Sequence, residues 1–306
     1  ENGTKGWSIE KDINLVTQVV RDFTVPNNSN DIRVIVSMTD NSGNTSTNAD
    51  KPFILSIDKD NPVTEVRFTP NDSGDDPVYT GFFKENRIMT VTVTERNFDP
   101  ALVNLISTCD EASYTVPKTF DGGTQVVIDG IQYYRYTMTH EFKNDGDYTF
   151  EMNVTDKATN RTDDNMISYG SDKQKEVAKV FTIDKTMPVL EVSVDGERGD
   201  IYGNTEYFRG DVTVTVTINE HNFDEIAGDR YEAVFRMLHP QTGEISTVAV
   251  PARSSFTRNG DVTVCEYVFS AAAGAMTVFE SLEVTDKAGN TTVEEPGNTF
   301  VPDETQ

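Results

Sequence analysis

The chain has few of the residues on which disulfide scaffolds and metal or redox chemistry depend. It contains two cysteines, one tryptophan and three histidines in 306 residues. Cys109 and Cys265 lie at positions that the repeats described below do not relate to each other, so no disulfide framework is expected. Scarcity of cysteine alone does not assign a protein to the cytoplasm, because exported proteins also fold without disulfides.

Basic residues are also scarce relative to acidic ones. The chain has 26 Lys and Arg against 51 Asp and Glu, a net charge of −25. Such a field repels phosphate, so we expect no nucleic acid partner and no membrane contact within this segment. No apolar run approaches the roughly 18 to 20 residues of a membrane span, and no signal peptide opens the sequence. We expect a monomeric segment of a longer chain, with any export signal elsewhere.

No pattern of catalytic residues stands out. His140, His221 and His239 occupy unrelated places, and the sequence has no nucleophile elbow, phosphate-binding glycine loop or zinc-ligand spacing. With 51 acidic residues, a pair of carboxylates arises by chance and gives no evidence of glycoside hydrolysis. We therefore expect that the protein is not an enzyme and requires no cofactor.

Self-similarity at a long period organises the chain. Residues 91–99 read Val-Thr-Val-Thr-Glu-Arg-Asn-Phe-Asp and return at 216–224 as Val-Thr-Ile-Asn-Glu-His-Asn-Phe-Asp. A Thr-Asp turn with an asparagine four residues after the aspartate occurs three times. An Asp-Lys-x-x-Pro phrase follows the first two turns, and proline resists continuing a central strand, so the phrase separates two units. The turns lie at 39–44, 155–160 and 285–290, and the phrases at 58–62 and 184–188.

The residue pattern between these motifs is that of β-strands. Val212, Val214, Val216 and Ile218 alternate with threonines, a period of two with one apolar face. Helical periodicity is weak throughout, and Gly-, Asn- and Asp-rich turns separate the short strands. These features predict two-sheet antiparallel sandwiches of roughly 100 residues or slightly more.

Two details refine this prediction. Tyr148, at the entry to a late strand, resembles the tyrosine corner of immunoglobulin-type domains, in which the hydroxyl bonds the backbone just upstream. The later repeat has no tyrosine there. It also places Glu280 on the same strand face as Val278, Leu282 and Val284, a face that is otherwise apolar. We expect a β-bulge or an altered strand at Glu280.

The turn, the linker phrase and the Glu-x-Asn-Phe-Asp strand end together resemble the tandem bacterial immunoglobulin-like (Ig-like) repeats of large Gram-positive cell-surface and adhesin proteins. The resemblance implies an all-β fold of tandem Ig-like antiparallel β-sandwich domains. The boundaries predict a partial, C-terminal half of an Ig-like domain at 1–60 and complete domains at 61–185 and 186–306. Because half a sandwich exposes an apolar face, we expect residues 1–60 to be unstable alone.

Oxygen-bearing side chains are predicted to converge where one domain meets the next. In an Ig-like sandwich the loop after the second strand, the last hairpin turn and the incoming linker lie at the same end. Calcium takes six to eight oxygen ligands, so a calcium site at each junction is one hypothesis. Its candidate ligands are Asp58, Asp60, Glu95, Asn97, Asp99, Asp156 and Asn160 at the first junction, and Asp184, Glu220, Asn222, Asp224, Asp286 and Asn290 at the second.

Other interpretations of these residues remain open. Asp and Asn in such turns bond their own backbone amides, Phe98 and Phe223 pack in the core, and nearby lysines neutralise the acids without metal. A Lys-Asn or Lys-Asp isopeptide bond assisted by Glu95 or Glu220 is a further alternative. His221 replaces Arg96 of the earlier repeat, for which a solvent-exposed position is the simplest explanation. The lysines in question are Lys59, Lys157, Lys185 and Lys287.

The function expected from the resemblance is a non-catalytic structural or binding array of a bacterial cell-surface protein, extracellular and either cell-wall-attached or secreted. Fold alone does not fix a ligand. One alternative is recognition of a host protein, for example an immunoglobulin, through an exposed strand edge. The other is an accessory, non-catalytic module of a secreted glycan-degrading enzyme, for which Tyr133 and Tyr134 are the candidate glycan platform.

Overall fold

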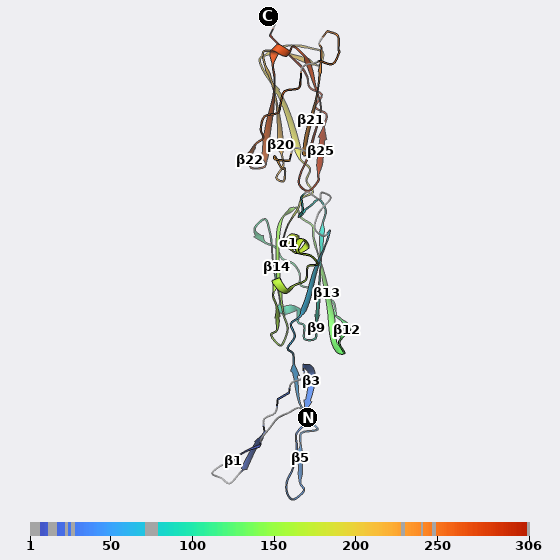
Figure 1. Cartoon of the computed structure of the whole chain (residues 1–306), viewed down its shortest axis with the longest axis vertical. Helices are drawn as coiled ribbons and strands as arrows, with labels where there is room; N and C mark the ends of the chain where they lie inside the picture. The colour runs from blue at the N-terminus through green and yellow to red at the C-terminus, as the bar shows by residue number, and fades with distance from the viewer. Residues whose placement is uncertain are drawn as a thin grey trace.

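The protein is an extended array of β-structure. The computed structural model describes residues 7–11, 17–21, 24–25, 28–70, 79–227, 230–239, 241–246 and 249–304. Three parts follow one another along the long axis, and the C-terminus lies at the far end of the third (Figure 1). Both sheets of each complete part run along that axis, so the chain enters each part at one end and leaves it at the other.

The middle part folds into two packed sheets, which we call the middle sandwich. One sheet has the order β12-β13-β9-β7, and the other has the order β11-β10-β14-β16-β8 with β15 also paired to β14. All pairs are antiparallel except β16–β8. The strands are β7 (Val63–Thr69), β8 (Phe82–Phe83), β9 (Arg87–Glu95), β10 (Val103–Cys109), β11 (Ala112–Ser113), β12 (Thr124–Ile128), β13 (Ile131–Phe142), β14 (Gly146–Thr155), β15 (Arg161–Thr162) and β16 (Val180–Ile183).

The C-terminal part repeats this arrangement and is here called the C-terminal sandwich. Its sheets have the orders β17-β20-β23-β22 and β18-β19-β26-β24-β21, with β25 paired to β24. In the middle sandwich β7, β9, β13 and β12 share one sheet, and in the C-terminal sandwich β17, β20, β23 and β22 take the same places, like the A, B, E and D strands of immunoglobulin domains. The strands are β17 (Val189–Asp195), β18 (Arg198–Tyr202), β19 (Thr205–Arg209), β20 (Val212–Asn219), β21 (Tyr231–Leu238), β22 (Thr257–Asn259), β23 (Val262–Phe269), β24 (Met276–Thr285), β25 (Thr291–Glu294) and β26 (Thr299–Asp303).

Alternating apolar residues build the two cores. Along β20 each valine of the repeat is fully buried while the threonines between are half-buried, which confirms the predicted period of two. In the middle sandwich, Phe68, Phe142, Phe150 and Phe181 pack with ring centroids 5.3 to 6.1 Å apart. The predicted all-β, Ig-like fold class is confirmed.

The two predicted details are also present. The Tyr148 hydroxyl donates to the Asn144 carbonyl at 2.9 Å, so the tyrosine corner is formed. In the C-terminal sandwich, Val234 pairs with Ser281 and Phe235 pairs with Phe279, so Glu280 is the extra residue of a bulge. The bulge lets Phe279 and Leu282 both face the core, and it turns Glu280 outward to an ion pair with Arg236 at 3.0 Å.

One α-helix is present among the described residues, although helical periodicity is weak throughout the sequence. The helix α1 (Asp172–Lys179) lies between β15 and β16. Ser171 caps its first turn and Gln174 bonds back to the cap, the capping box that Ser-x-x-Gln forms. The helix is anchored by Arg87, a fully buried side chain that donates to the Val177 carbonyl at 2.7 Å and the Pro70 carbonyl at 3.1 Å. The C-terminal sandwich connects β25 to β26 without a helix.

The described residues of the N-terminal part form paired strands, and no second sheet covers them within that part of the chain. Strand β3 pairs with β6 and β4 pairs with β5, the pairing that β14 makes with β16 and β15. Phe53 and Ile54 are 67% and 55% exposed, whereas Phe181 and Ile183 of the equivalent strand β16 are buried. The strands are β1 (Trp7–Lys11), β2 (Thr17–Arg21), β3 (Ser29–Val34), β4 (Ser37–Thr39), β5 (Thr45–Thr47) and β6 (Phe53–Ile57); the side chains of β1 and β2 are outside the described residues.

Candidate functional site

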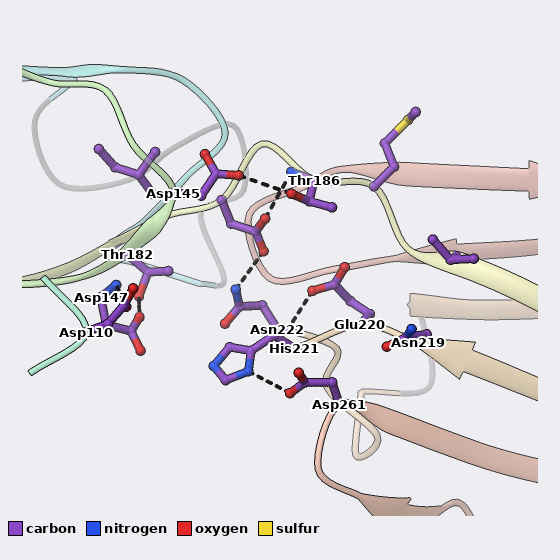
Figure 2. A pocket seen from close by; sticks show the side chains of 15 residues that line it. Asp110, Asp145, Asp147, Thr182, Thr186, Asn219, Glu220, His221, Asn222 and Asp261 are labelled. Carbon is purple, nitrogen blue, oxygen red and sulfur yellow. Dashed lines mark hydrogen bonds and ion pairs between the residues drawn. The ribbon is translucent and has the colours of Figure 1, made fainter.

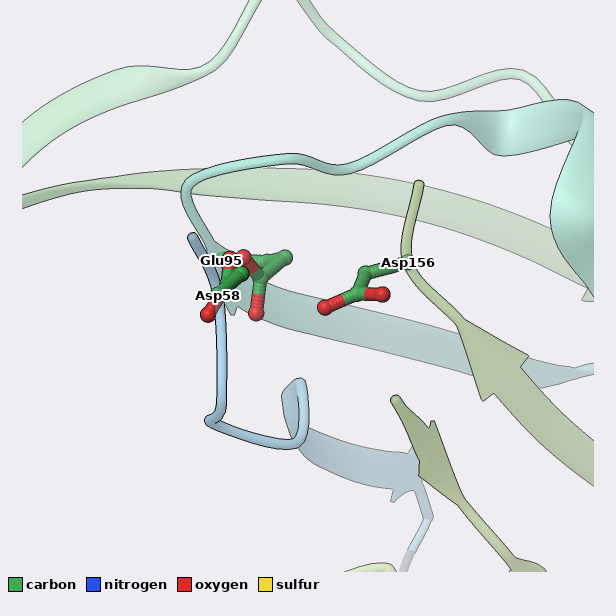
Figure 3. A group of neighbouring side chains, drawn as sticks. All are labelled: Asp58, Glu95 and Asp156. Atoms are coloured by element: carbon green, nitrogen blue, oxygen red, sulfur yellow. The ribbon is translucent and has the colours of Figure 1, made fainter. Parts of the chain in front are cut away.

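Three segments meet at each end-to-end junction and bring three carboxylates together. They are the linker after the preceding part, the loop after the second strand, and the turn after the strand equivalent to β14. At the first junction these segments supply Asp58, Glu95 and Asp156, with one oxygen from each within 4.8 Å of the others (Figure 3). At the second junction Asp184, Glu220 and Asp286 meet the same criterion. We call these sets the first and the second acidic trio.

Local hydrogen bonds explain why each acid takes its place. Asp156 Oδ1 accepts from the Asn160 amide at 2.8 Å and Oδ2 accepts from Asn160 Nδ2 at 2.8 Å, which closes the turn. Asp286 and Asn290 repeat both bonds at 2.9 and 2.7 Å. Glu220 Oε1 accepts from the Asn222 amide at 2.7 Å, as Glu95 does from the Asn97 amide at 2.9 Å. The hydrogen-bonded turns expected from the sequence are therefore present.

The same asparagines tie the linker to the following sandwich. Asn290 Nδ2 donates to the Asp184 carbonyl at 2.9 Å, and Asn222 Nδ2 donates to Asp184 Oδ2 at 2.6 Å. At the first junction Asn160 Nδ2 donates to the Asp58 carbonyl at 3.2 Å, and Asn97 Nδ2 donates to Asp58 Oδ2. We call this repeated pair of contacts the linker clamp. It holds a linker aspartate by its backbone and by its side chain.

Burial dominates the electrostatics of the trios. Glu95 is 1% exposed and Glu220 is 5% exposed. Burial, reinforced by Asp58 and Asp156, raises the pKa of Glu95 to about 7, and burial with Asp184 and Asp286 does the same for Glu220. Burial also raises the pKa of Asp286. A buried carboxylate that lacks a positive partner favours its protonated form.

The two junctions differ in one cation. Arg96 Nη2 lies 2.9 Å from Asp58 Oδ1, and both side chains are at least 95% buried. Burial of Asp58 opposes ionisation, but hydrogen bonds from Asp60, Asn97 and Arg96 and the guanidinium charge hold the pKa of Asp58 below its usual range. The equivalent His221 points instead to Asp261, 2.7 Å away, and its side chain is 66% exposed.

This contrast corrects one prediction from the sequence. The position shared by Arg96 and His221 is solvent-exposed in the second repeat only, because in the first the guanidinium is enclosed by Asn28, Asp58 and the Tyr133 ring. No ion pair within 4.0 Å joins the second acidic trio to a basic side chain among the described residues. Two homologous sites thus differ in whether an arginine contacts the linker aspartate: Arg96 contacts Asp58, whereas the buried Arg230 at the second junction donates to the Asp286 carbonyl, at 3.4 Å.

Of the candidate ligands, the four asparagines belong to the turns and the linker clamp, and three carboxylates also lie outside the trios. Asp60 accepts from the Tyr133 hydroxyl at 3.2 Å, Asp99 caps the short helix at 100–102 through the Ala101 amide at 3.0 Å, and Asp224 accepts from the Tyr79 hydroxyl at 2.7 Å. The repeated motif after the second strand predicted convergence, but it could not separate a helix cap from a ligand, because both use an aspartate just after a strand. Arg96, Asn28 and Tyr133 were missed as parts of the site.

The remaining alternatives find little geometric support among the described residues. No lysine Nζ lies within 4.0 Å of Glu95 or Glu220 there, as an isopeptide bond would require, and Lys185 pairs with Asp145 at 3.4 Å. Tyr133 and Tyr134 are half-buried, and their hydroxyls bond Asp60 and Gln132. They do not form an open platform for a sugar ring.

The fold and the junctions define a class: a tandem array of Ig-like β-sandwich domains. Residues 89–172, most of the middle sandwich, match the family described as bacterial Ig-like domain. The chain therefore carries a bacterial Ig-like domain, as its motifs predicted, and the fold family is non-catalytic. A search of curated proteins gave no match to the chain. Bacterial Ig-like domains are commonly extracellular, and no helix of the described residues is long and apolar enough to cross a membrane.

Proposed function

We propose that the chain is a non-catalytic spacer segment of a bacterial cell-surface protein, extracellular and attached to the cell wall or secreted. It carries other parts of that protein away from the surface. The observation that supports this role is the linker clamp, which occurs at both junctions with equivalent residues. A spacer transmits position only if its joints resist bending, and the clamp removes rotational freedom from each linker.

Further contacts at the second junction also restrict bending between the two sandwiches. The Tyr79 hydroxyl of the middle sandwich donates to Asp224 of the C-terminal sandwich at 2.7 Å, and the Arg230 guanidinium lies 4.7 Å from the Tyr79 ring centre. Lys287 Nζ lies 5.6 Å from the Phe82 ring centre. The joint is therefore held by direct contacts between the two sandwiches in addition to the linker clamp, which a stiff array requires.

Small-angle scattering of the full chain tests the spacer role. The expected particle is elongated, with a narrow distribution of shapes, and Asn222→Ala combined with Asn290→Ala broadens that distribution because both clamp contacts are lost. Asn204→Ala, an exposed residue in the turn between β18 and β19 that takes no part in the clamp, is the matched control. A broad distribution in the unaltered chain, unchanged by the clamp substitutions, contradicts the proposal.

We further propose that the acidic trios bind calcium, which stiffens the joints. The second trio favours this most, because its three carboxylates are at least 95% buried and none of them makes an ion pair within 4.0 Å among the described residues. The nearby Arg230 guanidinium donates to the Asp286 carbonyl at 3.4 Å instead of to a carboxylate of the trio. Calcium is a hard cation that prefers carboxylate and amide oxygens, and it would offset the cost of gathering these charges. At the first junction Arg96 already supplies one positive charge.

Thermal melts in millimolar calcium and in EDTA test this proposal. Calcium is expected to raise the melting temperature of the C-terminal sandwich, since a ligand that binds only the folded state stabilises it. Asp286→Asn should reduce the calcium effect, whereas Asp195→Asn, an exposed acid of the same sandwich, should leave it unchanged. Identical melts in calcium and EDTA exclude calcium as a structural ligand and leave the hydrogen-bonded clamp alone.

A further inference from the structure

A cavity of about 470 Å³ separates the middle and C-terminal sandwiches beside the second junction (Figure 2). Its wall on the middle sandwich carries Asp110 and Asp147, and the wall on the C-terminal sandwich carries His221 and Asp261. The linker contributes Met187, which is 60% exposed. The cavity therefore combines negatively charged walls with an apolar surface.

The first junction shows what fills this space when the chain provides its own occupant. The Thr-Asp turns at 39–44 and 155–160 align the N-terminal part with the middle sandwich, so Asn28 and Asn30 correspond to the segment at 144–146 that borders the cavity. At the first junction, the segment that contains Asn28 and Asn30 encloses the Arg96 guanidinium together with the linker and the loop after β9.

The bound guanidinium has well-defined partners. Arg96 Nη2 contacts Asp58 Oδ1 at 2.9 Å and Asn28 Oδ1, and the Arg96 guanidinium carbon lies 5.7 Å from the Tyr133 ring centre. Its side chain is 5% exposed. The linker aspartate of a junction is thus a guanidinium acceptor in this fold.

At the second junction the same acceptor is present and the arginine is not. Asp184 replaces Asp58, Asn222 replaces Asn97, and His221 stands where Arg96 would be but is directed to Asp261. We propose that this cavity binds an arginine side chain of a partner protein, with the guanidinium taking the place that Arg96 has at the first junction.

The cavity suits an arginine in shape and charge. Asp110 and Asp147 are exposed and make no ion pair within 4.0 Å with a basic residue among the described residues. Asp110 Oδ1 accepts from the Asp147 amide at 2.8 Å and Asp147 Oδ1 accepts from the Thr182 hydroxyl at 2.6 Å, so each carboxylate keeps acceptor capacity for a guanidinium. Met187 offers an apolar surface to the three methylenes of an arginine, which bury their stem while the charged head remains among acceptors. Guanidinium matches carboxylates in planar, paired hydrogen bonds that an ammonium group does not make.

Nuclear magnetic resonance of the labelled full chain tests the proposal with a defined probe, N-acetyl-arginine-N′-methylamide, in EDTA so that no calcium occupies Asp184. Saturable shift changes are expected at residues 182–189, 219–222 and 261, with a dissociation constant in the millimolar range. The citrulline analogue, which has the same shape without the charge, should give none. Shift changes spread over acidic surfaces in general, or equal changes with citrulline, overturn the proposal.

Two variants locate the binding. His221→Arg places an arginine on the chain where the first junction has one, so it should weaken probe binding at least tenfold by filling the cavity. His239→Arg makes the same substitution at an exposed position away from the cavity and should leave probe binding unchanged. Equal probe binding by both variants refutes the assignment. A failed arginine titration with an intact calcium effect on the melting temperature rejects this inference and leaves the spacer and calcium proposals standing.

Discussion

At the scale of single residues, Glu95 and Glu220 occupy places where an ionised carboxylate is costly. Each has two further carboxylates nearby, and burial raises the pKa of each from 4.5 to about 7. Between these two pH values the folded protein holds a proton that the unfolded chain releases. The stabilisation from each glutamic acid is therefore fully present below about pH 4.5 and is lost as pH rises through 7.

The substitution Glu220→Gln tests this linkage. At about pH 8 in EDTA we expect the variant to be more stable than the unaltered chain by about 1–3 kcal/mol, because glutamine keeps the shape of the neutral acid. Below about pH 4.5 the difference should vanish. Glu191→Gln, on an exposed face of β17, serves as the control, and denaturant unfolding followed by circular dichroism is the measurement. Parallel pH profiles for Glu220→Gln and the unaltered chain contradict the assignment.

The sequence predicted that these acids lie beside acids of the linker and of the turn, but it did not predict the arginine at the first junction. Glu95 and Glu220 were recognisable because the residues around them repeat, and a repeat predicts equivalent places in equivalent folds. The burial of Arg96 was not predictable, because its enclosure depends on Asn28 and Tyr133, which come from two other segments. A contact among three distant segments leaves no local pattern.

At the scale of elements, α1 is the main departure from the predicted architecture. Its eight residues are too few for a helical period to stand out, although Ser171 and Gln174 have the spacing of a capping box. Strand alternation predicted the sheets well. Glu280 predicted a bulge because it is a charged residue on the otherwise apolar face of β24. Arg87 was missed, because an arginine at the start of a strand is usually exposed.

Substitution of Arg87 by methionine tests the anchoring of α1. The guanidinium lies 4.3 to 4.6 Å from the ring centres of Phe68, Phe83 and Phe181, and its donors satisfy two carbonyls. Methionine fills the space but leaves both carbonyls without that donor, so we expect a loss of about 3 kcal/mol in the middle sandwich. Calorimetry should show its transition at lower temperature, with that of the C-terminal sandwich unchanged.

The control for this prediction is Arg67→Met on β7 of the same sandwich, where the side chain is 51% exposed and pairs with Glu65. An exposed ion pair contributes roughly 0–1 kcal/mol, so this variant should melt almost as the unaltered chain does. If both arginine variants lose the same stability, Arg87 has no special role in holding the helix.

At the scale of the whole molecule, the three parts differ in what they can bury. The two sandwiches each enclose a core between sheets, whereas Phe53 and Ile54 of the N-terminal part remain mostly exposed. We expect a fragment of residues 1–60 to show no cooperative melting transition by circular dichroism, and a fragment of residues 61–185 to show one. A cooperative, concentration-independent transition of the 1–60 fragment contradicts this expectation.

The linker clamp also has a consequence for the order in which the array assembles. Asn160 closes on Asp58 across 102 residues, and Asn290 closes on Asp184 across 106 residues. A chain that emerges N-terminus first from a ribosome or an export channel thus presents each linker long before the asparagine that fixes it. Each new sandwich swivels freely until its last hairpin has emerged, and the array becomes rigid one repeat behind the point of exit.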